Sequence, residues 1–200
     1  VALIGAGNFA RGVLIPELVK LEGVRLEAVV TRRGAGAEAA RETFGFAHSQ
    51  TDPETVFASP RVNAVIIATR HDSHAALTMR ALRAGKAVLV EKPLGLDRVE
   101  IEGVRAARAE SQAFFQVGFN RRFAPLAREM RGHLERLSGP KFLLLRVNAG
   151  PVPNESWIDD AREGGGRILG EVCHFVDLAR YLTGAAIVSV GAEAPRWSAE

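Results

Sequence analysis

The chain opens with Val1-Ala2-Leu3-Ile4-Gly5-Ala6-Gly7-Asn8-Phe9-Ala10, and this stretch decides its fold. The first four residues are apolar and are typical of a buried strand. The next six have the spacing G-x-G-x-x-A. In that pattern Gly5 permits a tight turn, Gly7 lets a ligand approach the backbone, and Ala10 lets a helix pack closely on the strand. Because the N-terminus of such a helix attracts phosphate groups, the stretch predicts a dinucleotide-binding site.

Composition excludes several classes of protein. Hydrophobic residues make up 47% of the 200 residues, which is enough for a core, and no apolar run approaches the ~20 residues of a membrane span. The single cysteine, Cys173, excludes an internal disulfide framework and favours a reducing, cytoplasmic location. The net charge is only +3 and the basic residues form no run, so we expect no nucleic-acid partner.

Strand and helix patterns alternate through the first 119 residues. Apolar runs predict further strands at 26–31, 64–68, 88–90 and 114–119. Helical patterns occupy 35–44, 73–84 and 97–110, with Ser73 and Asp97 as expected caps and Pro16 as an expected kink in the first helix. Strands separated by such helices indicate an α/β protein with a doubly wound parallel sheet, so residues 1–119 are predicted to form a Rossmann domain.

The pattern changes after residue 120, and residues 120–200 are assigned to a second α/β domain. We expect one long helix at 121–137, a strand at 141–148, a loop at 149–163, a helix at 168–182 and a strand beginning at 187–190. Two strands cannot form a stable sheet layer by themselves. The second domain is therefore expected to be incomplete within this chain.

The residues that close the second strand bear on the choice of cofactor. An acidic residue there accepts hydrogen bonds from the ribose 2′-OH of NAD, whereas a nearby arginine accommodates the 2′-phosphate of NADP. This chain has Thr31-Arg32-Arg33 and no acidic residue at that place. A phosphate would meet a guanidinium and a hydroxyl, so the segment favours NADP over NAD. The alternative interpretation is a pair of solvated loop arginines.

Three further segments carry a resemblance to a known family. Thr69-Arg70-His71-Asp72-Ser73-His74 follows a strand end, where ligands bind in open α/β sheets. Glu91-Lys92-Pro93 follows the next strand, and Gly164-Gly165-Gly166 precedes a helix with the pattern H-x-x-D from His174. In this order, together with the glycine fingerprint, the segments resemble the Gfo/Idh/MocA family of nicotinamide-dependent oxidoreductases. The resemblance covers essentially the whole chain.

The resemblance implies a fold and an activity. It implies a Rossmann domain followed by a domain with an open, mostly antiparallel sheet, through which a homo-oligomer is expected. It implies hydride transfer between NADP or NAD and a hydroxyl or carbonyl of a sugar, polyol or nucleotide-sugar. The sequences of residues 7–16 and 170–175 are also similar to those of family modules in two-module chains, where a zinc-alcohol-dehydrogenase-like module comes first.

Three residues are candidates for the chemistry. Lys92 matches the lysine of the family's E-K-P motif, and an ammonium can stabilise a developing alkoxide. His174 matches the helix histidine, and an imidazole can take or return the proton near neutral pH. Many relatives have an aspartate four residues before this histidine, where the chain has Gly170. Glu171 stands next to it and is the third candidate, able to orient His174 or bind a substrate hydroxyl.

The remaining site residues follow from the same matches. The residues expected to bind the cofactor are Gly5, Gly7, Asn8, Phe9, Ala10, Thr31, Arg32, Arg33, Ala68, Thr69, His71, His74, Glu91 and Lys92. Those expected to bind the substrate are Lys92, Asn120, Arg121, Trp157 and His174. One of His71 and His74 is expected near the nicotinamide and the other to cap or pack. No further ligand clusters with them, so no metal site is expected. Asp177 is expected to be structural and to bond to backbone or to an arginine.

Two other functions remain open at this point. The first is a non-catalytic NAD(P)-binding sensor or regulator. The presence of Lys92 and His174 argues against this alternative. The second is an enzyme whose tightly held cofactor is recycled within an epimerisation, an elimination or a glycoside cleavage.

Overall fold

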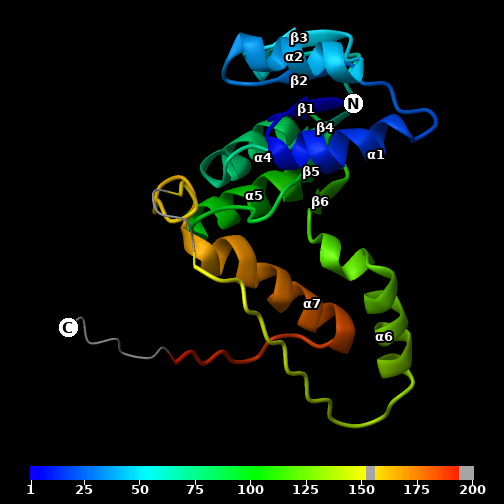
Figure 1. Cartoon of the computed structure of the whole chain (residues 1–200), viewed down its shortest axis with the longest axis vertical. Helices are drawn as coiled ribbons and strands as arrows, with labels where there is room; N and C mark the ends of the chain where they lie inside the picture. Colours follow the sequence, from blue (N-terminus) through cyan, green and yellow to red (C-terminus); the bar gives the residue numbers. More distant parts are fainter. Residues whose placement is uncertain (152–155, 194–200) are drawn as a thin grey trace. The chain divides into compact units, whose positions relative to one another are not determined.

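The computed structural model describes residues 1–151 and 156–193 and divides the chain into two compact units (Figure 1). The first unit comprises Val1–Phe119 and Asn148–Cys173, and the second comprises Asn120–Val147 and His174–Glu200. The sequence assigned everything after residue 119 to a second domain. In the structure, however, the segment 148–173 groups with the first unit.

A six-stranded sheet forms the centre of the first unit, with the strand order β3-β2-β1-β4-β5-β6. Neighbouring strands pair in parallel throughout this sheet. The strands are β1 (Ala2–Ile4), β2 (Ala28–Val30), β3 (His48–Gln50), β4 (Ala64–Ile67), β5 (Ala87–Val90) and β6 (Phe115–Val117). This strand order belongs to the doubly wound nucleotide-binding fold, which confirms the predicted fold class.

Helices cover both faces of the sheet, and alternate strand residues face opposite layers. Ala2 and Ile4 of β1 belong to one buried cluster, while Leu3 between them belongs to the other. The first cluster includes residues of α3 (Glu54–Phe57), α4 (His74–Arg83) and α5 (Arg98–Glu110). The second includes residues of α1 (Ile15–Val19) and α2 (Gly34–Phe44). Burial on both faces explains why the central strands read as continuous apolar runs.

Local sequence signals set several helix boundaries. The Asp97 carboxylate accepts a hydrogen bond of 2.8 Å from the Glu100 N–H, which confirms it as the cap of α5. Pro16 lies in the first turn of α1, directly after a π-helical segment at Ala10–Leu14, so the helix changes from π to α type at the residue before this proline. Ser73 is at the N-cap position of α4, as predicted. Its hydroxyl, however, bonds to the Thr69 hydroxyl and the Arg70 carbonyl and makes no capping hydrogen bond to the helix.

Two elements, β3 and α3, were not predicted from the sequence. The β3 strand is His48-Ser49-Gln50, which lies at one edge of the sheet and is partly exposed. A polar edge strand of three residues has neither the apolar run nor the alternation by which strands are recognised. The α3 helix has only four residues, fewer than a helical periodicity needs to be visible.

The second unit contains α6 (Pro125–Glu135) and α7 (Cys173–Thr183), preceded by a short 3-10 turn at Asn120–Phe123. The helix expected at 121–137 is thus confirmed over Pro125–Glu135, but it is not continuous with the residues before the proline. Ala124 adopts an extended conformation with ψ of 137°, because the residue before a proline is driven out of the helical region. The helix expected at 168–182 is confirmed, with a π-helical first turn at Ile168–Val172.

Arginine contacts hold α7 to its neighbours within the second unit. The Arg122 guanidinium forms an ion pair with both carboxylate oxygens of Asp177. The Arg121 guanidinium lies 4.6 Å from the centre of the Phe175 ring, and Arg131 lies 4.6 Å from that of Tyr181. Asp177 is thus a structural residue paired with an arginine, as predicted.

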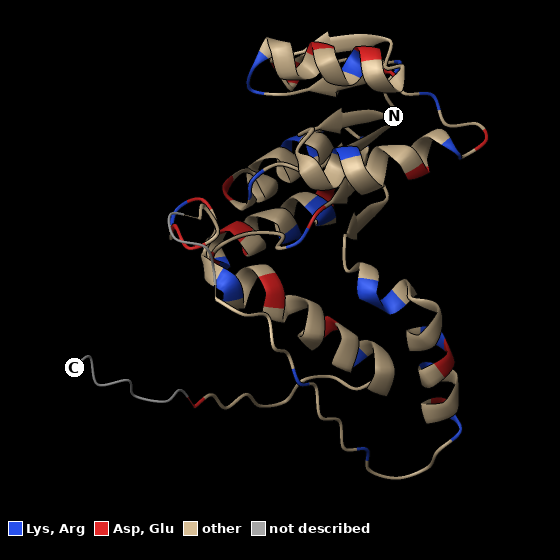
Figure 2. Cartoon of the chain, viewed as in Figure 1, with Lys and Arg blue, Asp and Glu red and all other residues tan. Residues whose placement is uncertain are grey.

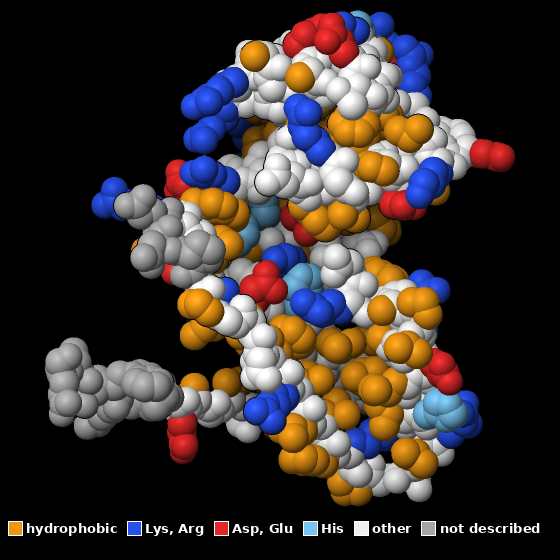
Figure 3. Space-filling view, viewed as in Figure 1, with side chains coloured by type: hydrophobic (Ala, Val, Ile, Leu, Met, Phe, Trp, Pro, Cys, Tyr) orange, Lys and Arg blue, Asp and Glu red, His pale blue; other side chains and the backbone are white. Residues whose placement is uncertain are grey.

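The strands expected at 141–148 and 187–190 are not formed in the described residues. Phe142 and Val188 are 88% and 95% exposed, and hydrophobic side chains gather on the face of the second unit seen in Figure 3. A strand needs a partner that satisfies its backbone hydrogen bonds, and neither segment pairs with another here. The expected C-terminal sheet is therefore absent from the described part of the chain, and a homo-oligomer formed through it stays a prediction.

Charged residues are interspersed along the helices of both units (Figure 2). The α5 and α6 helices each carry acidic and basic side chains, with ion pairs between Arg105 and Glu102 and between Arg131 and Glu135. Among the residues that the structure describes, no helix is long and apolar enough to cross a bilayer.

Candidate active site

A cavity of about 610 Å³ lies in the first unit at the carboxyl ends of β1, β2 and β4. Its volume is in the range of small-molecule and cofactor sites, and ligands of open parallel sheets bind at this edge. The residues that line it are Ile4, Gly5, Gly7, Asn8, Phe9, Ala10, Val30, Thr31, Arg32, Thr51, Pro53, Ala68, Thr69, Arg70, Asp72, Ser73, Leu77 and Trp157.

The two fingerprint glycines, Gly5 and Gly7, are needed for different physical reasons. Gly5 has a φ of +94°, and a Cβ there would lie 2.4 Å from the Ala68 carbonyl oxygen, so the fold itself requires glycine. Gly7 has no such φ, and a Cβ there would meet nothing within 4 Å. Since Gly7 lines the cavity, a side chain would take space only from a ligand. This contrast fits a dinucleotide whose pyrophosphate approaches the backbone at Gly7.

The segment that closes β2 lies partly in the cavity. Thr31 and Arg32 line it, whereas Arg33 does not and precedes the first residue of α2. The Thr31 hydroxyl donates a hydrogen bond of 2.7 Å to the Arg33 carbonyl, which fixes the turn. Arg11 was not singled out from the sequence. Its guanidinium donates to the carbonyls of Ala6 at 3.0 Å and Gly36 at 2.9 Å, and so fastens the glycine loop to α2.

Lys92 follows β5 and turns toward the π-helical segment Ile168–Val172. Its ammonium donates a hydrogen bond of 2.7 Å to the Gly170 carbonyl and lies 3.3 Å from the nearer carboxylate oxygen of Glu171. The Lys92 side chain is only 18% exposed. The structure therefore brings together two of the three residues proposed for the chemistry, and it places the Glu171 carboxylate beside the lysine.

The adjacent Glu91 lies outside the described cavity. Burial raises the pKa of its carboxyl group, an effect that the Lys92 backbone N–H and charge partly oppose. A Cβ at Gly118 would lie 2.8 Å from a Glu91 carboxylate oxygen, so the carboxyl group packs against the backbone that follows β6. The predicted contact between Glu91 and a cofactor stays a prediction.

The loop at 156–166 is tied to the segment that follows β4. Arg70 forms an ion pair with Glu163, and the Asp72 N–H donates a hydrogen bond of 3.1 Å to the Glu163 carbonyl. The Trp157 ring packs edge-on against the His71 ring, with 4.8 Å between ring centres, and Trp157 lines the cavity. These contacts give the predicted substrate wall a fixed place beside the cofactor cavity.

The two histidines after β4 differ in their surroundings. His74 is fully buried, with its ring nitrogens 2.7 Å from the Pro93 carbonyl and 3.1 Å from the Thr69 carbonyl. It packs between two loops and does not line the cavity. His71 is 7% exposed, and its Nδ1 lies 2.7 Å from the Gly164 carbonyl oxygen. Burial is the main cause that lowers the pKa of both imidazoles, and their hydrogen bonds to carbonyl oxygens partly oppose it.

The other candidates lie in the second unit. His174 is buried near the start of α7, while Asn120 and Arg121 are exposed in the 3-10 turn before α6. Their assignment to the substrate continues to depend on their positions in the sequence motifs.

Several cavity residues were not predicted from the sequence. Thr51 and Pro53 follow β3, and they were missed because that strand was missed. Asp72, Ser73 and Leu77 lie at or near the start of α4. Asp72 and Ser73 follow the end of a strand, and this position could have identified them as cavity residues. Leu77 has the pattern of an ordinary core residue and carries no such signal.

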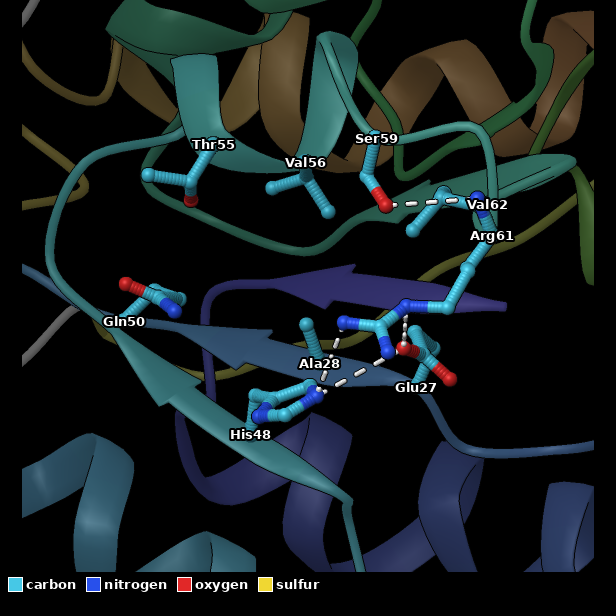
Figure 4. Close-up of a pocket in the computed structure, with 9 residues that line it drawn as sticks. All are labelled: Glu27, Ala28, His48, Gln50, Thr55, Val56, Ser59, Arg61 and Val62. Carbon is cyan, nitrogen blue, oxygen red and sulfur yellow. Dashed lines mark hydrogen bonds and ion pairs between the residues drawn. The ribbon is translucent and has the colours of Figure 1, made fainter.

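A second, smaller cavity of about 170 Å³ lies between α3 and the strands β2 and β3 (Figure 4). The buried Glu27 carboxylate lines it, with one oxygen 2.9 Å from Arg61 Nε and 3.6 Å from His48 Nε2. The other oxygen lies 3.1 Å from Arg25 Nε. The Glu27 carboxylate thus has an arginine partner at each of its two oxygens.

The strand order, the glycine turn and the cavity above it define a nucleotide-binding protein of the Rossmann class. Residues 1–119 match a family model described as an oxidoreductase family with an NAD-binding Rossmann fold. The chain belongs to this family, the Gfo/Idh/MocA oxidoreductases, which confirms the resemblance predicted from the motifs.

Named relatives agree with this assignment. An inositol 2-dehydrogenase from Rhizobium meliloti (strain 1021) is 31% identical over 96% of this chain and 57% of its own. A levoglucosan dehydrogenase solved with NADH and L-sorbose has a TM-score of 0.78 at 25% identity, over 92% of this chain and 52% of that one. A 3-ketoreductase from Actinomadura kijaniata, solved with NADP and TDP-benzene, has a TM-score of 0.75 at 25% identity. The match covers 90% of this chain and 56% of that one.

The chain spans just over half the length of these relatives. The family description and the two solved relatives support a nicotinamide cofactor. One relative holds NADH and the other NADP, so the preference of this chain stays a prediction. The suggestion of a two-module chain likewise stays a prediction.

Proposed function

We propose that this protein is an NAD(P)-dependent oxidoreductase that transfers a hydride between the cofactor and a hydroxyl or carbonyl carbon of a polyol or sugar. The observation that carries the proposal is the Lys92 ammonium. It is held at 2.7 Å from the Gly170 carbonyl, in the unit that also contains the glycine-lined cavity. A loop lysine without a role would extend into solvent, because burying an ammonium is costly unless it is paired.

The cavity offers groups suited to each part of a dinucleotide. Gly7, Asn8 and Phe9 supply backbone to the pyrophosphate, and Ala68 and Thr69 line the far side after β4. Thr31 and Arg32 line the cavity after β2 and would hold the ribose of the adenosine half, where the absence of an acidic residue favours NADP. When bound, the cofactor accepts or donates the hydride at its nicotinamide ring.

The protein's part in the reaction is to hold the substrate oxygen and move its proton. In oxidation, Lys92 donates a hydrogen bond to the reacting oxygen and stabilises the negative charge that develops on it. His174 takes the hydroxyl proton and returns it in the reverse direction. Glu171, whose carboxylate lies 3.3 Å from the ammonium, keeps Lys92 oriented.

A polyol or sugar is the substrate class that the relatives suggest. Their names include inositol 2-dehydrogenase, scyllo-inositol 2-dehydrogenase and levoglucosan dehydrogenase. Trp157 provides an apolar wall against which one face of a sugar ring can stack. Asn120 and Arg121 are proposed to contact the substrate's hydroxyl groups.

The first experiment is a titration of the protein with NADPH and with NADH, followed by protein fluorescence. Wild-type protein and Lys92→Ala are then assayed with inositols, levoglucosan and L-sorbose in both directions. We expect tight cofactor binding by both proteins and turnover by the wild type alone. Failure of both cofactors to bind would contradict the proposal. A cofactor that copurifies without any net turnover would contradict the dehydrogenase reaction and favour an internally recycled hydride.

A further inference from the structure

We propose that His71 is a positioning residue for Lys92, acting through the backbone of Gly164 and Gly170. The proposal depends on the function proposed above, because it concerns the lysine at the centre of that reaction. Nothing in the sequence assigned His71 this task. The motif predicted that one of His71 and His74 lies near the nicotinamide. In the structure His71 lies outside the described cavity, between the segment after β4 and the segment that leads into α7.

The first step is the hydrogen bond between His71 and Gly164. The Nδ1 atom lies 2.7 Å from the Gly164 carbonyl oxygen, and a carbonyl can only accept, so Nδ1 carries the proton. This bond spans 93 residues of sequence and is buried. It ties the end of the 156–166 loop to the segment after β4. Because burial lowers the pKa of His71, the ring is neutral at pH 7 and its tautomer is fixed by this bond.

The second step is the contact between His71 and Gly170. A Cβ at Gly170 would lie 3.1 Å from His71 Cε1, closer than carbon atoms pack without displacement. A Cβ at position 170 would therefore crowd the imidazole and require it to shift by a few tenths of an ångström. His71 thus lies beside both ends of the stretch from 164 to 170: it is hydrogen-bonded to Gly164, and its ring lies beside the position that a Cβ at Gly170 would take.

The third step connects this stretch to the lysine. The Gly170 carbonyl accepts a hydrogen bond of 2.7 Å from Lys92 Nζ, and Glu171 supplies the neighbouring carboxylate. A lysine side chain has several rotatable bonds, so its ammonium takes one position only where its partners are fixed. Gly170 belongs to a π-helical turn, a conformation that is rare and concentrated at functional sites. His71 restrains this turn at the residue whose carbonyl receives Lys92.

The test compares three substitutions of His71. His71→Asn keeps a donor in place, because the asparagine amide nitrogen is bonded to Cγ as Nδ1 is. His71→Gln also has an amide, but its nitrogen lies one bond further along the side chain. His71→Ala has no side-chain donor at all. We expect kcat of the asparagine variant to stay within about threefold of wild type. We expect the other two to lose about 10- to 100-fold in kcat, as for a displaced catalytic group. The dissociation constant of the cofactor should be unchanged in all three.

A double-mutant cycle tests the packing step. Gly170→Ala should lower kcat in the wild-type background, because its Cβ meets the His71 ring. In the His71→Ala background the ring is gone, so the same substitution should cost little further activity. Strong non-additivity of this kind is expected for residues in contact. Additive losses from the two substitutions would overturn the proposed route through Gly170.

A readout independent of turnover separates this proposal from the proposed function. The chain has four lysines, so 13C-lysine labelling gives four Cε signals, and Lys92→Arg identifies that of Lys92. We expect His71→Ala and His71→Gln to shift the Lys92 signal and His71→Asn to leave it in place. An unmoved signal in the first two variants would overturn the proposal. A shifted signal in a protein that oxidises no polyol would leave it standing and contradict the proposed function instead.

Discussion

Lys92 Nζ lies 2.7 Å from the carbonyl oxygen of Gly170, a residue 78 positions later in the chain. The contact joins the segment after β5 to the turn that opens the last helix, and Glu171 adds a carboxylate at 3.3 Å. Two motifs that are separate in the sequence thus meet at one ammonium group. The family's E-K-P lysine and the glycine-rich helix start form a single structural feature.

Substitution of Lys92 should separate binding from chemistry. In Lys92→Ala we expect cofactor affinity within about twofold of wild type, since the glycine loop is untouched. We expect kcat/KM to fall by about 10²- to 10³-fold, the usual loss when one donor to a developing oxyanion is removed. Steady-state kinetics with a turned-over polyol measures this loss. Lys20→Ala is the matched control, because Lys20 is an exposed lysine paired with Glu17, and it should behave as wild type.

The two fingerprint glycines should respond to substitution in different ways. Gly5→Ala should destabilise the fold, because the Cβ would lie 2.4 Å from the Ala68 carbonyl and φ is +94°. Gly7→Val should leave the melting temperature close to wild type while abolishing cofactor binding, because the side chain fills space only in the cavity. Thermal unfolding and fluorescence titration distinguish the two. Normal cofactor affinity in Gly7→Val would contradict the placement of the pyrophosphate.

Arg61 should contribute to stability because it pairs with a buried carboxylate. Arg61→Ala leaves Glu27, which is 3% exposed, with fewer partners, and should lower the free energy of unfolding by about 1–3 kcal/mol. Arg105→Ala breaks an exposed pair with Glu102 and should cost no more than about 1 kcal/mol. Urea denaturation measures both. If Glu27→Gln is added to Arg61→Ala, part of the loss should be recovered, because a neutral amide then replaces a buried carboxylate that has lost one of its two arginine partners.

Stability should fall as the pH drops below about 6.5. Burial lowers the pKa of His71 and His74 from 6.5, so in this range the unfolded chain binds protons that the folded protein does not. The free energy of unfolding therefore decreases toward acid, by at most about 1.4 kcal/mol per pH unit for each histidine. Denaturation between pH 5 and 7 tests this. His71→Asn should make the slope shallower, because it removes one of the two buried imidazoles.

The Rossmann half was predictable because its signals are local and strong. The apolar run Ala64–Ile67, the Asp97 cap and the glycine turn each determine a structure within a few residues. By contrast, the polar edge strand His48–Gln50 is defined by its pairing with β2, which its own residues do not reveal. The same reason explains the failed prediction at 141–148, where an apolar run finds no partner strand.

The candidate site was predictable where a motif names its residues, and less so where geometry decides. The motifs identified Lys92 and Glu171, but not that the two side chains meet. The motif left open which of His71 and His74 would pack, and the structure buries His74 fully between two carbonyls. Arg11, which holds the glycine loop to α2, has no sequence signature because its acceptors are backbone carbonyls.

Arg32 and Arg33 should differ in their effect on the choice of cofactor. Both are exposed basic residues, but only Arg32 lines the cavity beside Thr31. Arg32→Asp should weaken NADPH binding by about 10- to 100-fold through loss of a charge-assisted hydrogen bond and repulsion of the 2′-phosphate. It should leave NADH binding the same or tighter, because a carboxylate can accept from the ribose 2′-OH. Arg33→Asp is the matched control and should change the ratio of the two affinities by less than about threefold. Equal responses of the two variants would place the phosphate elsewhere. A wild-type protein that binds NADH more tightly than NADPH would contradict the predicted preference itself.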